Sequence, residues 1–214
     1  MLGSGVSGVV RLCVHRATGT EYAVKCLDLG AVRSLPQLQA LRNEISIMCQ
    51  LDHPCIVRIA EVYESANEIY IVQELCRGGD LFDRLDEQQQ DPNSSDDAPY
   101  CYTEAQCARL VQQMLLAIGY LHHQGIVHRD LKLENFLFST TDADSDLKLI
   151  DFGLSKHFEM GEYQNELVGT PYTVAPEILK GENENRFRRS HEIRSANLTA
   201  IFFFSTQFFT RLIQ

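Results

Sequence analysis

Two short polar segments in the second half of the chain carry the residue types that phosphoryl transfer requires. They read His-Arg-Asp-Leu-Lys-Leu-Glu-Asn at 128–135 and Asp-Phe-Gly at 151–153. Phosphoryl transfer needs a base near the attacking hydroxyl, oxygen ligands for Mg²⁺, and cations on the phosphates. These three roles are filled in order by Asp130, by Asn135 with Asp151, and by Lys132. One such segment alone would indicate an ordinary loop with solvated charges, but the two in this order and spacing predict a catalytic site.

A glycine-rich segment opens the chain and could enclose a triphosphate. It consists of Gly3, Ser4, Gly5, Val6, Ser7, Gly8, Val9 and Val10. Glycines at this spacing let backbone amides close over phosphates. The same spacing marks dinucleotide-binding folds, in which the motif follows a strand and opens a helix. Here the alternating, β-branched run 9–15 follows instead, so we expect a β-hairpin, which favours the triphosphate interpretation.

A strand lysine and a helical glutamate form a candidate pair. Lys25 ends the run Tyr-Ala-Val-Lys at 22–25, where it could bind the α- and β-phosphates if a carboxylate fixed its position. Apolar residues recur at helical spacing over 36–51, and Glu44 lies on or near the inward face of that helix. Either residue alone would be interpreted as a solvated surface charge. Together they predict a contact between Lys25 and Glu44.

From residue 3 to about residue 180 the chain resembles a eukaryotic protein kinase domain. It is most similar to the group of calcium/calmodulin-dependent and calcium-dependent protein kinases, on the segments 74–84, 128–138, 147–156 and 169–177. The resemblance implies an α+β, two-lobed fold with a small β-rich N-lobe (about 1–75) and a helical C-lobe from about residue 76. It also implies ATP and Mg²⁺ as cofactors. Lys132 and Thr170 match family positions that hold a small aliphatic hydroxyl, which implies Ser or Thr substrates.

The resemblance further implies how the nucleotide is bound. Adenine would lie between Val10, Ala23 and Leu137. Glu74 and Cys76 would give backbone hydrogen bonds to the edge of the adenine ring. Gln73 would lie at the entrance to a pocket behind the adenine, at a position where the group usually has a bulky apolar residue. The expected cofactor-binding set is Gly3, Ser4, Gly5, Val6, Ser7, Gly8, Val10, Ala23, Lys25, Glu44, Gln73, Glu74, Cys76, Leu137 and Asp151. The expected catalytic set is Asp130, Lys132 and Asn135, and the expected metal ligands are Asn135 and Asp151.

Composition and charge indicate which partners to expect. The 214 residues are 44% hydrophobic and carry a net charge of −10, which argues against a general nucleic-acid or membrane-surface binder. Asp80 and Glu134 match family positions that contact arginines before the phosphoacceptor, so we expect basic protein or peptide substrates; the alternative is that both carboxylates face water. Calcium- or calmodulin-linked regulation of a parent protein stays open, since the chain contains no EF-hand loop.

Cysteine usage indicates the compartment. The seven cysteines show no Cys-x-x-Cys pairs or metal-binding spacing, and the chain has no secretory signal at its start. Reduced thiols in a cytoplasmic or nuclear protein are therefore expected.

The expected elements alternate with polar segments. Strands are predicted at 9–15, 20–27, 56–64 and 68–74, and helices at 36–51, 80–86 and 103–124. Thr103 should cap the last helix and Gly125 should end it. Residues 88–98, which include Gln-Gln-Gln-Asp-Pro-Asn-Ser-Ser-Asp-Asp, should form a disordered polar loop.

The resemblance stops near residue 180, so we expect a kinase domain at 1–180 with an incomplete C-lobe. Residues 181–214 should be a non-homologous tail, disordered or mis-spliced; the alternative is a helix that replaces part of the missing lobe. Its apolar run at 201–209 is much shorter than the roughly 20 residues of a membrane-spanning helix. Two functions follow: a Ser/Thr protein kinase, or a catalytically impaired nucleotide-binding or interaction fragment. A small-molecule kinase is disfavoured by the peptide-docking segment at 151–177.

Overall fold

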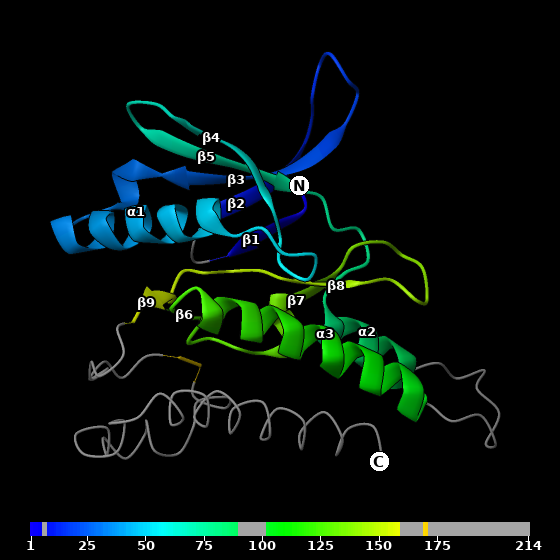
Figure 1. The fold of residues 1–214 in the computed structure, drawn as a ribbon. Coiled ribbons are helices and arrows are strands. Elements are labelled where there is room, and N and C mark those ends of the chain that lie inside the picture. Colours follow the sequence, from blue (N-terminus) through cyan, green and yellow to red (C-terminus); the bar gives the residue numbers. More distant parts are fainter. Residues whose placement is uncertain (6–7, 90–101, 159–168, 171–214) are drawn as a thin grey trace, which may run out of the picture.

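The computed structural model describes residues 1–5, 8–89, 102–158 and 169–170. Its first part is a five-stranded antiparallel sheet with the order β1-β2-β3-β5-β4 (Figure 1). The strands are β1 (Gly3–Gly5), β2 (Gly8–Val14), β3 (Glu21–Asp28), β4 (Ile59–Glu64) and β5 (Glu68–Glu74). The expected glycine-rich hairpin is confirmed, because β1 pairs with β2 and places Gly3 opposite Val10 and Gly5 opposite Gly8.

Helix α1 (Leu35–Gln50) packs on this sheet after the short 3-10 turn η1 (Leu29–Ala31). The Ser34 hydroxyl accepts a hydrogen bond from the Gln37 amide and caps the helix, and Pro36 stands in its first turn, where a missing N–H costs nothing. Leu41 and Ile45 pack against a buried cluster on the sheet, formed by Leu27, Ile69 and Ile71. The apolar spacing of the sequence therefore predicted this helix and its inward face correctly.

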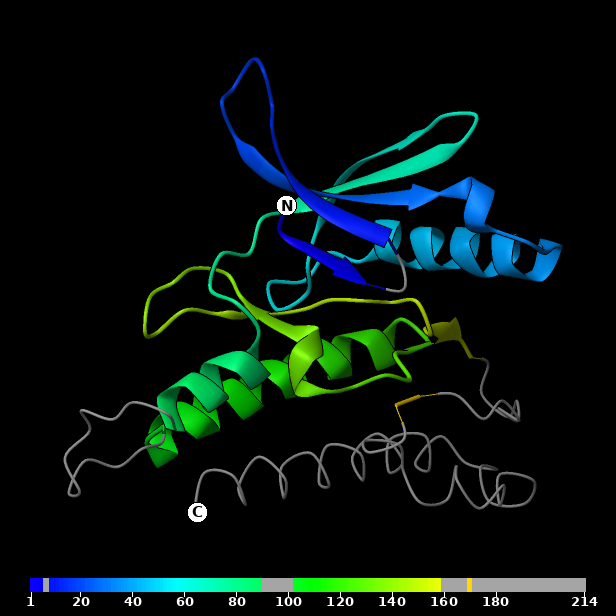
Figure 2. The ribbon, with the colours of Figure 1, turned by 180° about the vertical axis from the view of Figure 1, so that it is seen from behind.

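Within the described residues, the second part contains two helices and several short strands. Its elements are α2 (Leu81–Gln89), α3 (Glu104–His123), β6 (Ile126–Val127), η2 (Leu133–Asn135), β7 (Phe136–Phe138), β8 (Leu147–Leu149) and β9 (Lys156–His157). The strands form two antiparallel pairs, β6 with β9 and β7 with β8. Both ribbon views place them between the large sheet and α3 (Figures 1 and 2). The two-lobed α+β architecture predicted from the sequence is therefore confirmed.

Helix α3 supplies much of the core of the second part. Thr103 caps it, with its side chain and that of Gln106 forming a reciprocal capping box. Its buried positions include the predicted Leu110, Met114, Ala117, Ile118 and Leu121. Beyond its end, Gly125 has φ 69°, a left-handed conformation that glycine adopts without strain. Ile47 and Met48 of α1 belong to the same apolar cluster, so one core joins the two lobes.

Two element boundaries differ from the sequence-based prediction by more than one residue. β4 begins at Ile59 rather than at 56, because Ile56 forms a parallel bridge with Leu149 in the other lobe. α2 continues through Gln89, so residues 88–89 are helical and not part of a disordered loop; glutamine is a good helix former. The rest of that expected loop and the expected tail at 181–214 lie outside the described residues.

Among the residues that are described, no helix has the length and apolarity to cross a membrane.

Candidate active site

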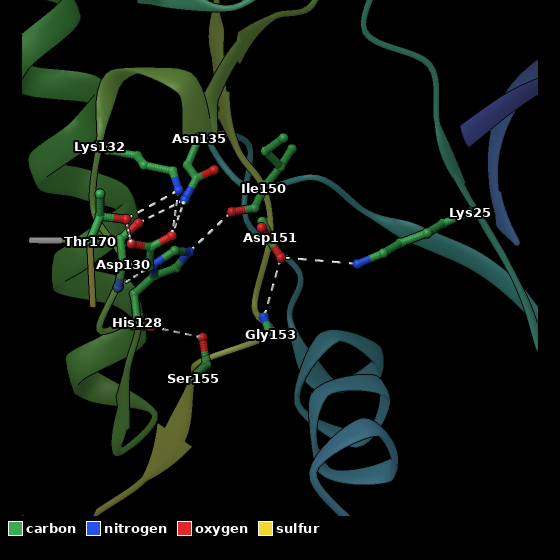
Figure 3. Close-up of polar contacts among 10 residues, drawn as sticks. All are labelled: Lys25, His128, Asp130, Lys132, Asn135, Ile150, Asp151, Gly153, Ser155 and Thr170. Atoms are coloured by element: carbon green, nitrogen blue, oxygen red, sulfur yellow. Dashed lines mark hydrogen bonds and ion pairs between the residues drawn. The ribbon is translucent and has the colours of Figure 1, made fainter. Parts of the chain in front are cut away.

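A buried histidine holds the loop between β6 and β7. The Nδ1 atom of His128 accepts a hydrogen bond from the Asp130 amide at 3.3 Å. Nε2 therefore carries the ring proton, which it donates to the Ile150 carbonyl at 3.0 Å (Figure 3). Burial lowers the pKa of His128 and outweighs the opposing influence of the Ile150 carbonyl. The neutral ring thus ties the loop to the segment that leads into Asp151.

The carboxylate of Asp130 lies at the centre of a polar cluster (Figure 3). Its Oδ2 is 2.8 Å from Lys132 Nζ and 3.3 Å from Asn135 Nδ2. Thr170 Oγ1 donates to Oδ1 at 2.5 Å, and Asn135 Nδ2 also donates to the Asp130 backbone carbonyl at 2.7 Å. Burial alone would raise the pKa of Asp130, but the hydrogen bonds from Lys132 and Thr170 and the Lys132 charge lower it overall. The expected catalytic residues Asp130, Lys132 and Asn135 are therefore together, with an ionised carboxylate between them.

The second candidate carboxylate, Asp151, lies in a tight turn. It has φ 60°, and its Oδ1 accepts a hydrogen bond from the Gly153 amide at 3.4 Å. The intervening Phe152 is fully buried and meets the His128 ring edge-on, with centroids 5.1 Å apart. The buried ring anchors the turn, and the Asp151 side chain remains 39% exposed, so its oxygens are open to a ligand.

The predicted contact between Lys25 and Glu44 is present. Lys25 Nζ lies 3.0 Å from Glu44 Oε1, with side-chain exposures of 13% and 8%. Lys25 Nζ is also 4.0 Å from Asp151 Oδ1. Strand β3, helix α1 and the Asp-Phe-Gly turn thus meet at one ammonium group, which suits a residue that binds phosphates.

The sheet face that carries Lys25 also carries Val10 and Ala23, two of the expected adenine contacts, together with Gln73. Val10 is paired with Lys25, and Ala23 is paired with Gln73; side chains of directly opposed residues lie on the same face. Leu137, expected on the other side of adenine, is half-buried on β7 in the second lobe. In the glycine-rich segment, Ser4 and Gly5 belong to β1, whereas Val6 and Ser7 lie outside the described residues.

Glu74 immediately precedes the hinge between the lobes (residues 75–78), and its backbone can form only part of the expected contact with adenine. The Glu74 amide donates to the Arg58 carbonyl at 3.0 Å, so only the carbonyl of Glu74 suits the expected backbone contact with adenine. Beyond it, the Gly78 amide donates to the Phe138 carbonyl at 2.9 Å. Burial raises the pKa of the Cys76 thiol to about 11, so this side chain is a neutral, unreactive wall of the hinge.

An open cavity of about 560 Å³ is lined by residues of both lobes, among them Gly8, Glu44, Asp130 and Asp151. Asn135 uses Nδ2 on Asp130, which leaves its Oδ1 as the atom for a cation. Within the described part of the chain, no group of three or more His, Cys, Asp or Glu side chains is placed to hold a metal ion. One carboxylate and one amide oxygen nevertheless fit Mg²⁺, which usually keeps several waters and phosphate oxygens as ligands.

Three residues near the site were not singled out from the sequence. The buried Ser155 donates its hydroxyl to the His128 carbonyl at 3.3 Å, and Asn43 of α1 reaches the Ser155 carbonyl at 3.5 Å. Lys148 of β8 lies 3.0 Å from Glu74 at the hinge. Their partners are between 27 and 112 positions away in the chain, so no local pattern could have indicated them.

Comparison with known proteins agrees with this geometry. The family model described as protein kinase domain matches residues 1–207, and the chain belongs to this family. It is 42% identical over 180 residues to calcium-dependent protein kinase 27 of Oryza sativa subsp. japonica, covering 84% of this chain and 28% of the relative. It is 39% identical over 180 residues to calcium-dependent protein kinase 7 of Arabidopsis thaliana, covering 84% and 32%.

A third relative comes from an animal. The chain is 43% identical over 186 residues to the phosphorylase b kinase gamma catalytic chain, liver/testis isoform, of Mus musculus, covering 84% of this chain and 42% of the relative. The chain thus spans less than half the length of each of these three curated relatives.

Proposed function

We propose that the chain binds Mg-ATP and transfers the γ-phosphate to Ser or Thr hydroxyls of protein substrates. The observation that carries the proposal is the Asp130 cluster, in which one ionised carboxylate meets an ammonium group, an amide and a hydroxyl within 3.3 Å. Protein kinases need little covalent chemistry, because positioning and charge stabilisation supply most of the catalysis. The names of the relatives support the same class of activity.

Each side chain has a distinct task in this mechanism. Asp130 orients the substrate hydroxyl and accepts its hydrogen bond, and Lys132 neutralises charge that develops on the transferred phosphoryl group. Lys25, fixed by Glu44, holds the α- and β-phosphates beneath the glycine-rich hairpin. Asp151 and Asn135 would hold Mg²⁺, which would neutralise negative charge on the phosphates of the nucleotide.

Substrate preference and location are further parts of the proposal. We assign to Asp80 and Glu134 a preference for basic residues near the phosphoacceptor. Asp80 Oδ1 accepts a hydrogen bond from the Asp83 amide at 2.8 Å, so only part of its carboxylate can serve a substrate. A cytoplasmic or nuclear location and calcium-linked regulation of the whole protein complete the proposal, the latter supported by the names of two relatives.

Two measurements test the proposal. Calorimetry with MgADP should detect binding, and a radiolabel assay with Mg-ATP and a Ser-containing basic peptide should detect transfer. Asp130→Asn should keep MgADP affinity within about twofold and reduce transfer by at least about a hundredfold, since it removes the charge that orients the hydroxyl. Binding without transfer in the unmodified chain would favour the second candidate, a catalytically impaired nucleotide-binding or interaction fragment. Absence of binding would refute the kinase and the nucleotide-binding fragment, and would leave only the interaction fragment.

A further inference from the structure

The carboxylate of Glu74 joins three segments behind the hinge. Glu74 is the last residue of β5, and its Oε1 accepts a hydrogen bond from the Arg58 amide at 2.8 Å. The same oxygen lies 3.0 Å from Nζ of Lys148, in β8 of the other lobe. One side chain of the first lobe is therefore bound both to the segment before β4 and to a strand of the second lobe.

The segment before β4 is itself fastened to β8. The Leu149 amide donates to the Cys55 carbonyl at 2.9 Å, and the Val57 amide donates to the Leu149 carbonyl at 3.0 Å. Leu149 is fully buried, so these bonds are shielded from water. Lys148 consequently projects from a strand whose position is fixed by backbone hydrogen bonds on the residue next to it.

The same strand leads directly to the candidate metal ligand. Lys148 and Asp151 are separated by Leu149 and Ile150 only, and the Ile150 amide donates to the Asn135 carbonyl at 2.9 Å. Glu74, at the other end of the ion pair, immediately precedes the hinge that is expected to bind adenine. The pair thus connects the part of the site for the base with the part for the phosphates and metal.

The ion pair of Lys148 with Glu74 is partly buried, so it can fix the relative position of the two strands that carry it. The side chains of Lys148 and Glu74 are 16% and 33% exposed, so solvent and salt screen the pair less than an exposed one. Both charges also act on nearby groups. Burial and, next to it, the Lys148 charge lower the pKa of His53. Burial and, next to it, the Glu74 charge raise the pKa of Cys76. By contrast, the ion pair of Arg109 with Asp146, at 2.8 Å, has exposures of 43% and 63%.

We propose that Lys148 is a positioning residue for the nucleotide: through Glu74 it fixes the hinge relative to Asp151, so that base and phosphates fit the site at the same time. This inference rests on the proposed function. A ligand that uses both ends of the site gains from their correct spacing, as two linked binding groups do when their separation matches the span of their sites. A ligand that uses only the base end does not.

The experiment compares MgADP with adenosine by calorimetry. Lys148→Met should weaken MgADP binding about three- to tenfold, the effect of a partly buried ion pair, and leave adenosine affinity unchanged. Lys148→Arg keeps a cation in reach of Glu74 and should restore MgADP affinity. Glu74→Gln keeps an acceptor for the Arg58 amide but removes the charge, so it should weaken MgADP binding as much as Lys148→Met does. The double variant Glu74→Gln/Lys148→Met should be no weaker than either single one.

The control is Arg109→Met, which breaks an ion pair within one lobe and should change neither affinity. Equal losses for MgADP and adenosine in Lys148→Met would overturn the inference, because they would indicate a disturbed hinge and no effect on spacing. Tighter MgADP binding would overturn it too, because the pair would then restrain the site. If the unmodified chain bound MgADP but Lys148→Met were unchanged, this inference alone would fail. If the unmodified chain bound neither ligand, the proposed function would fail, and the inference with it.

Discussion

Thr170 donates a hydrogen bond to Oδ1 of Asp130 at 2.5 Å, although 40 positions separate the two residues. Lys132 Nζ lies within reach of both, at 2.8 Å from Asp130 Oδ2 and 3.3 Å from Thr170 Oγ1. Because these partners lower the pKa of Asp130 against the effect of burial, the carboxylate is ionised at neutral pH and is a weak base. Its geometry suits orienting a hydroxyl more than removing a proton before the transfer step.

Loss of the Thr170 hydroxyl should therefore slow transfer and spare nucleotide binding. Thr170→Ala removes one donor from Asp130, and a hydrogen bond to a charged group contributes about 1.5–3 kcal/mol, so kcat for a basic Ser-containing peptide should fall at least about tenfold. Thr170→Ser retains the donor and should keep most of the rate. Steady-state kinetics with MgADP calorimetry separate the two effects, and an equal loss in both variants would exclude the hydroxyl as the cause.

Breaking the pair of Lys25 with Glu44 should cost both stability and affinity. Glu44 is 6% exposed, and an uncompensated buried charge costs about 3–5 kcal/mol. Lys25→Met should lower the midpoint of thermal unfolding and weaken MgADP binding at least about tenfold, since a phosphate contact is also lost. Lys25→Met/Glu44→Leu should recover most of the stability and none of the affinity. If the double variant also bound MgADP normally, Lys25 would have no role in holding phosphates.

Sequence patterns predicted those features that depend on neighbouring residues. The spacing of Leu41 and Ile45 predicted the inward face of α1, and Thr103 predicted the start of α3, because helix periodicity and capping are local properties. The contact between Lys25 and Glu44 was predicted by joining two such elements through their shared chemistry.

The features that the sequence did not predict are set by the packed lobes. Arg129 and Asp151 have φ values of 68° and 60°, which non-glycine residues rarely adopt and which surrounding structure must impose. The pairing of Ile56 with Leu149 and the ion pair of Lys148 with Glu74 join elements far apart in the chain. Periodicity and motif spacing contain no information on such contacts, and the mistaken start of β4 has the same origin.

Two glycine substitutions should have opposite effects on stability. A Cβ at Gly78 would lie 2.1 Å from the Thr140 carbonyl oxygen and 2.4 Å from Phe138 Cβ, so Gly78→Ala should destabilise by about 1–3 kcal/mol. Gly119 lies within α3, where a Cβ would have no neighbour within 4 Å, so Gly119→Ala should stabilise by about 1 kcal/mol. Urea unfolding measures both, and a neutral Gly78→Ala would mean that the hinge does not need this close approach to β7.

The buried His128 should make the folded chain sensitive to mild acid. Because burial lowers its folded pKa below the ordinary value of 6.5, the unfolded chain binds the proton more readily, and stability falls as pH drops below about 6.5, by up to about 1.4 kcal/mol per pH unit. His128→Phe preserves a ring beside Phe152 and cannot take up a proton there. It should lower stability at pH 7.5, through the lost hydrogen bonds, but reduce the further loss between pH 7 and about 5.5.

Urea unfolding across that pH range provides the measurement. Some acid sensitivity should persist in His128→Phe, because burial and Lys148 also lower the pKa of His53. If the free energy of unfolding had the same pH dependence in His128→Phe and in the unmodified chain, His128 would take up no proton on unfolding. The interpretation that a neutral His128 ring connects the catalytic loop to Ile150 would then be wrong.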